Sequence, residues 1–132
     1  MLFDLHKFDI LVLALTKILI NSINEEKINK LLDTQELVNL KGSISKLEAL
    51  LKRCNIEDNI LSSQIFFLRK LQNLRSASSA HRKGSNFDKI SKEFNIDKLG
   101  LMGVSKSILN DSIKFLNFLA AKIGRASCRE RV

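Results

Sequence analysis

No proline interrupts the 132 residues of this chain, and apolar residues recur at three- and four-residue spacing along most of its length. This spacing places apolar side chains on one face of an α-helix, and the chain has little of the strict alternation that marks a β-strand. Proline is the residue that most strongly kinks or ends a helix, so its absence leaves long helices uninterrupted. We therefore predict an all-α fold, a helical bundle of five or six helices.

The last ten residues, IGRASCRERV (123–132), differ in composition from the rest of the chain. They contain three of the seven arginines, whereas the preceding residues contain fifteen lysines and four arginines. The segment resembles the translation of a sequencing adapter. We therefore expect residues 1–122 to form a single helical domain, a fragment of a longer protein, and residues 123–132 to be a non-native, adapter-derived tail. Without the tail's three arginines and one glutamate, the formal net charge falls from +8 to +6.

Charge and composition exclude several classes of protein. A basic domain favours phosphate-bearing or acidic partners. No apolar run approaches the ~20 residues that span a bilayer, so we expect no membrane helix. His6, His81 and Cys54 are too scattered to hold a metal ion, and we expect neither a metal nor a cofactor. With Cys128 assigned to the tail, Cys54 is the only cysteine of the domain, which predicts no internal disulfide and suits a cytoplasmic location.

Cap residues and apolar stripes give approximate helix boundaries. The first helix, about residues 3–23, is apolar nearly all round, which predicts a central core helix or one buried against a partner. A second helix follows an N-cap at Asn24 and ends near residue 32. Residues 34–54 form either two helices or one helix kinked at Gly42, with Ser45 and Glu48 as a second cap pair. Later helices are expected from residue 58, over 86–95 and over 105–121, with a glycine-bearing loop at 100–103.

The most basic stretch of the chain lies between Asp58 and Asp88 and contains no acidic residue. Its candidate functional residues are Arg69, Lys70, Arg75, His81, Arg82 and Lys83. Arginine presents a planar fork that grips phosphate with two parallel hydrogen bonds, and His81 titrates near neutral pH. These groups suit RNA cleavage, in which a 2′-hydroxyl attacks the adjacent phosphate while protons are moved and cations stabilise the phosphoryl oxygens.

The segment Arg75-Ser-Ala-Ser-Ser-Ala-His81 resembles the R-x(4-6)-H signature of the HEPN superfamily (higher eukaryotes and prokaryotes nucleotide-binding). The resemblance implies an up-and-down helical bundle that forms a homodimer and acts as a metal-independent endoribonuclease with a composite site. Arg75 would bind the scissile phosphate and His81 would be the acid or base. Arg69, Lys70, Arg82 and Lys83 are the expected RNA contacts. Such domains are frequent in bacterial toxin–antitoxin and abortive-infection systems, which makes a cognate antitoxin or a sensor domain a candidate partner.

Two other functions fit the same sequence. Ser76 stands where active members of the superfamily often carry Asn or Asp, and inactive members serve as dimerisation or sensor modules. The very apolar first helix also favours such a module. Residues 89–115 resemble a helix-turn-helix DNA reader with an unusually long turn, which would require the helix 104–115 to protrude with Lys106 and Asn110 exposed. Arg75 and His81 also have ordinary roles, at the edge of a core and at a helix C-terminus.

Overall fold

The structure is a computed structural model that describes residues 5–80 and 92–123, and every regular element in these ranges is a helix. This confirms the predicted all-α bundle. The elements are α1 (Leu5–Thr16), the π-helical segment η1 (Lys17–Asn21), α2 (Glu25–Leu31), α3 (Thr34–Val38), α4 (Gly42–Lys52), α5 (Asp58–Ala80) and α7 (Ile96–Ile123). Among the described helices, none combines the length and the apolar character that crossing a bilayer requires.

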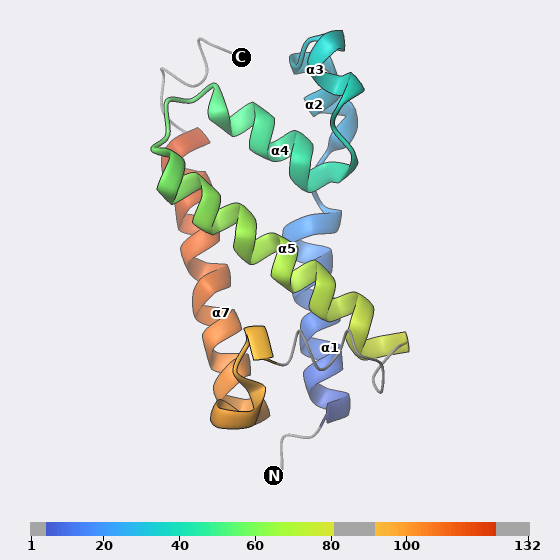
Figure 1. Ribbon diagram of the computed structural model, residues 1–132, viewed down its shortest axis with the longest axis vertical. Helices are drawn as coiled ribbons and strands as arrows, with labels where there is room; N and C mark the ends of the chain where they lie inside the picture. The colour runs from blue at the N-terminus through green and yellow to red at the C-terminus, as the bar shows by residue number, and fades with distance from the viewer. Residues whose placement is uncertain (1–4, 81–91, 124–132) are drawn as a thin grey trace.

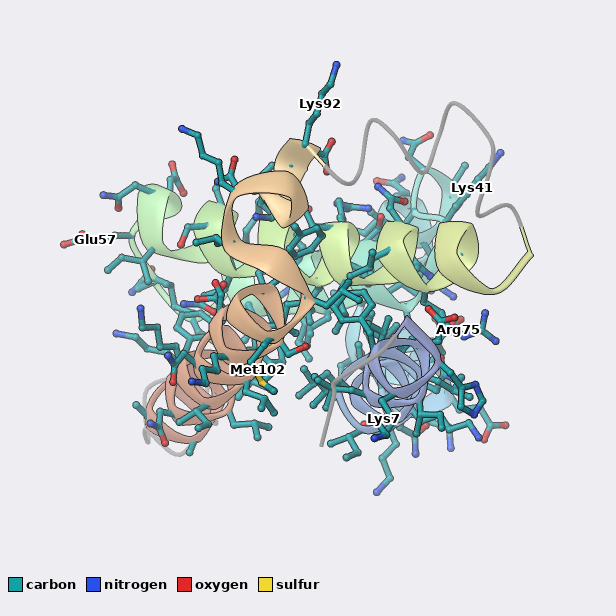
Figure 2. The ribbon with its side chains drawn as sticks, turned by 90° about the horizontal axis from the view of Figure 1, so that it is seen from below. Lys7, Lys41, Glu57, Arg75, Lys92 and Met102 are labelled. Atoms are coloured by element: carbon teal, nitrogen blue, oxygen red, sulfur yellow. The ribbon has the colours of Figure 1, made fainter. Side chains whose placement is uncertain are left out.

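The helices form two layers (Figure 1). Helices α1 and α7 lie side by side and run in the same direction, and α5 crosses over them in the opposite direction. Helix α4 packs against both α5 and α2, so α2 to α4 cover one end of the bundle. Figure 2 shows α1 and α7 together on one side of α5. Over most of their length, no described helix covers the face of α1 and α7 that points away from α5.

The core lies between these layers and is built from residues at helical spacing. On α5, the apolar residues at helical spacing, Leu61, Ile65, Leu68 and Leu71, are buried. The side chains that it meets are buried on one face of each neighbouring helix; the main ones are Phe8, Val12, Leu15, Leu51, Val104, Ile108 and Phe115. One stripe per helix is therefore enough to form the bundle.

Helix α1 is not buried on all sides. Val12 is completely buried, but Ile10 is more than half exposed, and so is Ile18 in the following segment η1. The prediction of a central core helix is therefore wrong, because α1 lies in an outer layer with one face in the core and another toward solvent. Its apolar outer face leaves burial against a partner as a prediction.

Local hydrogen bonds fix the first turns of α2 and α3, and the cap at Asn24 is the one that the sequence predicts. The Asn24 side chain accepts a hydrogen bond from the Lys27 N–H at 3.1 Å, and the Asp33 N–H donates to Glu36 Oε1 at 3.2 Å. Arg53, just after α4, donates to the Leu31 carbonyl at 2.8 Å and to the Glu36 carboxylate. The hydrogen bond from the Asp33 backbone, helped by Arg53, lowers the pKa of Glu36.

Residues 34–54 form two helices, which settles the alternative that the sequence left open. Gly42 has a φ of +84°, a conformation that L side chains rarely adopt, and it marks the start of α4. The prediction of a cap pair at Ser45 and Glu48 is wrong, because α4 has already begun and both residues lie inside it.

The last helix begins earlier than the sequence predicts. At Gly100, with φ 72° and ψ 169°, the chain kinks between a short helix that begins at Ile96 and the long helix that resumes at Leu101. The expected loop at 100–103 is therefore reduced to one residue. The predicted helix at 86–95 lies mostly outside the described residues. In the part that is described, Lys92 and Glu93 are helical.

The prediction of no internal disulfide is also contradicted, since Cys54 is disulfide-bonded in the structure. That prediction counted only the residues before the tail. The other cysteine of the sequence, Cys128, belongs to the tail and lies outside the described residues.

Candidate functional site

Helix α5 carries three of the six basic-stretch residues that the sequence singles out, namely Arg69, Lys70 and Arg75. The other three, His81, Arg82 and Lys83, lie outside the described residues. The paired arrangement of Arg75 and His81 therefore stays a prediction.

Arg69 is directed at the neighbouring helix α4. Its Nη2 donates to Ser45 Oγ at 3.1 Å and lies 3.6 Å from Glu48 Oε1. Exposed ion pairs of this kind contribute about 0–1 kcal/mol to stability. Arg69 thus joins α4 to α5, with part of its charge compensated by Glu48.

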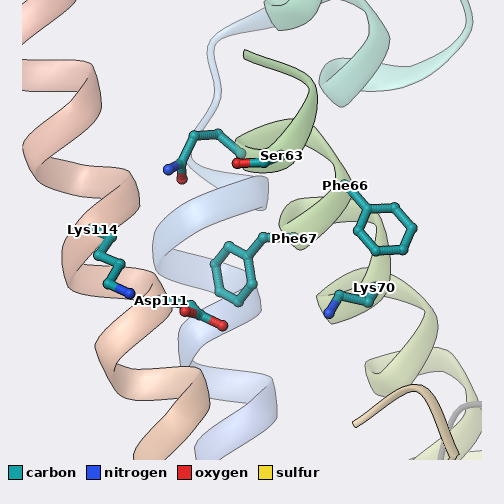
Figure 3. Close-up of a pocket in the computed structure, with 7 residues that line it drawn as sticks. Ser63, Phe66, Phe67, Lys70, Asp111 and Lys114 are labelled. Carbon is teal, nitrogen blue, oxygen red and sulfur yellow. The ribbon is translucent and has the colours of Figure 1, made fainter. Parts of the chain in front are cut away.

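Lys70 lies between two aromatic rings on the other side of α5. Its Nζ is 5.0 Å from the centre of the Phe66 ring and 4.9 Å from that of Phe94. An ammonium at this distance is attracted by the ring faces. Lys70 also borders a pocket between α5 and α7, where Figure 3 shows Asp111 and Lys114 on the opposite wall.

Arg75 lies where the buried stripe of α5 reaches solvent, as the sequence predicts. It is half-buried, it follows the fully buried Leu71 and Leu74, and Figure 2 shows it on the α1 side of α5. Helix α5 continues to Ala80, the residue before His81, so the serine-rich segment after Arg75 is helical. The three described cations thus lie toward three different neighbours and do not form one basic face.

The helix proposed for DNA reading, residues 104–115, is packed against the bundle. Val104, Ile108 and Phe115 are buried along it, while Lys106 and Asn110 are exposed. The outward face of this helix is partly apolar, which does not suit a groove lined with phosphates. The geometry therefore favours a role for α7 other than base recognition.

An apolar stripe on α7 is the feature that sequence reasoning missed. The exposed fractions are 48% for Met102, 40% for Leu109, 55% for Ile113 and 48% for Leu116. Helix α7 thus has one apolar face in the core and a second toward solvent. The spacing of 109, 113 and 116 was visible in the sequence, but periodicity alone does not tell which of two apolar faces a bundle covers.

The stripe continues into an apolar groove at the C-terminal end of α7. The groove has a volume of about 340 Å³, and Leu116 belongs to both the stripe and its lining. Ile18 of η1, Leu50 of α4 and Leu119 of α7 also line it. We call the four stripe residues together with Ile18 the η1–α7 apolar surface.

Within the described ranges, no group of three or more His, Cys, Asp or Glu side chains is arranged to hold a metal ion. Comparison of the chain with protein-family models, curated proteins and solved structures gave no match.

Proposed function

We propose that this chain is a helical dimerisation domain whose two copies pair through the η1–α7 apolar surface. The observation that carries the proposal is the exposed stripe of Met102, Leu109, Ile113 and Leu116. Large apolar side chains that are exposed singly are ordinary, whereas a contiguous patch usually marks an interaction site.

The spacing of the stripe supports a second copy of the chain as the partner. Leu109, Ile113 and Leu116 follow the alternating four- and three-residue steps of a coiled-coil seam. A two-fold axis brings the same surface of both copies together, so a seam of this kind can meet itself. Lys106 occupies one further seam position, where a single lysine fixes the register of paired helices at some expense in stability.

The charges beside the stripe are compatible with pairing of identical copies. The chain as a whole carries a net charge of +8, which would disfavour most close contacts between copies. The residues that flank the stripe on its outer side, Asn110 and Asn117, are uncharged. Lys106 in the seam and Lys27 in the lining of the groove are the cations whose repulsion the apolar contacts must outweigh.

Estimated energies indicate a dimer of moderate affinity. Complete burial of a Leu, Ile or Met side chain contributes roughly 1.5–3 kcal/mol. Each stripe residue is already about half buried, so dimerisation can bury only the other half. Four such residues on each of two copies contribute roughly 8 kcal/mol, against an association cost of about 4–15 kcal/mol. By this estimate the stripe alone falls short of the net of about 8 kcal/mol that a micromolar dissociation constant requires, so the groove beside Ile18 must contribute the remainder for the micromolar dimer that we expect.

The oligomeric state tests the proposal. Sedimentation equilibrium should show a monomer–dimer equilibrium for the unmodified chain, and Ile113→Glu should give a monomer with unchanged helicity because a charge would be buried in the seam. Ser107→Glu, an exposed residue on the other side of the same helix, is the matched control and should dimerise normally. A monomeric unmodified chain at about 100-fold the expected dissociation constant, or an Ile113→Glu dimer as stable as the parent, would refute it.

We propose metal-independent RNA cleavage as a second candidate activity of the same dimer. The observation that favours it is the unbroken course of α5 from Arg75 to the residue before His81, as the resemblance to the HEPN signature requires. Arg75 would bind the phosphate and His81 would move a proton, while the 2′-hydroxyl attacks the phosphorus and the 5′-oxygen leaves. The second subunit would complete the site.

A gel assay of RNA cleavage in the presence of a chelator tests this activity. Arg75→Ala and His81→Ala should each abolish cleavage, typically by 100-fold or more for loss of a proton-transfer group. Both variants should still dimerise, and Arg69→Ala, which removes an expected RNA contact but no reacting group, should lower cleavage much less. Intact RNA with the unmodified dimer would leave the dimerisation function and overturn the enzymatic one.

A further inference from the structure

The pocket between α5 and α7 takes Asp111 and Lys114 from α7, and neither residue belongs to the apolar stripe (Figure 3). It has a volume of about 200 Å³. Since a water molecule occupies about 30 Å³ of liquid, this space corresponds to roughly six or seven waters. The pocket is partly open to solvent, and its volume suits a small metabolite.

Two ammonium groups border this pocket. Lys70 comes from α5 and Lys114 from α7. In the described part of the chain, no carboxylate lies within 4.0 Å of either ammonium, so neither charge is used in an ion pair there. Lys70 is held between the rings of Phe66 and Phe94. A restrained side chain loses less conformational entropy when it binds an anion than a free lysine does.

One carboxylate lies in the same pocket. Asp111 is half-buried and stands on the same wall as Lys114, with the buried Phe67 ring on the facing wall (Figure 3). An ionised carboxylate only accepts hydrogen bonds. It repels a simple anion, so a ligand that suits this pocket must present donors, preferably cationic ones, to Asp111 as well as an anion to the lysines.

We propose that this pocket binds a small α-amino acid as its zwitterion. The ligand carboxylate would lie between Lys70 and Lys114, and the ligand ammonium would donate to Asp111. The remaining polar groups of the wall, Ser63 and Gln64, would contact a short polar side chain. Charge-assisted hydrogen bonds at both ends of the ligand give selectivity, because an analogue that lacks either charge leaves a charged protein group without its partner.

Two measurements on the full chain test the proposal. A thermal-shift panel of the twenty L-amino acids identifies the tightest binder, because a ligand that binds only the folded state raises the melting temperature. Calorimetric titration then compares that amino acid with its des-amino and its decarboxylated analogues and with inorganic phosphate. Both analogues should bind at least tenfold more weakly than the amino acid, and phosphate should not bind measurably.

Matched variants assign the contacts. Lys70→Gln and Lys114→Gln should each weaken amino-acid binding about tenfold or more, the usual consequence of losing one charge-assisted hydrogen bond. Asp111→Asn should weaken binding of the amino acid but not that of the des-amino analogue. Lys106→Gln removes the same charge from α7 outside the pocket and should leave the affinity unchanged. Circular dichroism checks that each variant is folded.

Several results would overturn the proposal. These are no response to any amino acid, equal binding of the amino acid and its des-amino analogue, or binding of phosphate as strong as that of the amino acid. An equal loss of affinity in Lys106→Gln would indicate general charge attraction instead of a site. Ile113→Glu should not alter amino-acid affinity, so failure of the pocket and failure of the dimer are separate outcomes.

Discussion

Two isoleucines on α7 allow the core and the proposed interface to be tested with the same substitution. Ile108 is completely buried, whereas Ile113 is 55% exposed. Truncation of Ile108 to Ala removes three buried carbons, worth about 0.8 kcal/mol each, and leaves a cavity. We expect Ile108→Ala to reduce the free energy of unfolding by roughly 2–5 kcal/mol at every protein concentration.

Ile113→Ala should behave differently because about half of this side chain is exposed in the single chain and becomes buried only when two copies associate. In a monomer, the loss of about half the transfer energy, roughly 1 kcal/mol, is partly offset by the higher helix propensity of Ala. In the proposed dimer, both copies lose the other half, about 2 kcal/mol in total, which weakens dimerisation roughly 30-fold.

Denaturant unfolding followed by circular dichroism at two protein concentrations separates the two effects. The unmodified chain should unfold at higher denaturant when it is more concentrated, and this dependence should shrink in Ile113→Ala but persist in Ile108→Ala as far as the variant stays folded. If Ile113→Ala and the unmodified chain showed the same concentration dependence, the assignment of Ile113 to an interface would be wrong.

Two further predictions concern the fold. Gly100→Ala should lower stability by about 1–3 kcal/mol, because the backbone at Gly100 lies in a region that is essentially restricted to glycine. The added Cβ would meet no atom within 4 Å, so the loss comes from backbone conformation and not from a clash. Thermal unfolding measures the loss, and an unchanged melting temperature would contradict it. Glu36→Gln tests the lowered pKa of Glu36: since the folded pKa lies below the unfolded value, the carboxylate contributes stability above pH 4.5 that is lost as the pH falls through the folded pKa. The difference in unfolding midpoint between the parent and Glu36→Gln should therefore be present at neutral pH and vanish in acid, and a difference that grew in acid would exclude this role.

Local signals in the sequence predicted the helices well. Asn24, Asp33 and the stripe on α5 act through neighbours only one or two turns away, so their effect is encoded within a few residues. The predicted cap at Ser45 failed for the same reason. Its hydroxyl meets Arg69, which is 24 residues away, and only the folded chain brings them together.

The layer position of each helix could not be predicted from periodicity. The N-terminal helical segment and α7 each have more apolar surface than one core covers. The sequence does not show whether Ile10, Ile18 and Ile113 face the core or solvent. The pocket was missed because Lys70 was grouped with its neighbours in the basic stretch. Arg69 and Lys70 are adjacent in sequence but lie toward different helices, since adjacent residues on a helix project about 100° apart.

The π-helical segment η1 determines the wall of the apolar groove. A π-turn accommodates one residue more than an α-turn at the same position. In η1, Leu19 and Ile20 are both buried while Ile18 lines the groove. The extra residue in this turn changes the direction in which the following side chains project, so two adjacent residues can enter the core while the one before them stays at the surface.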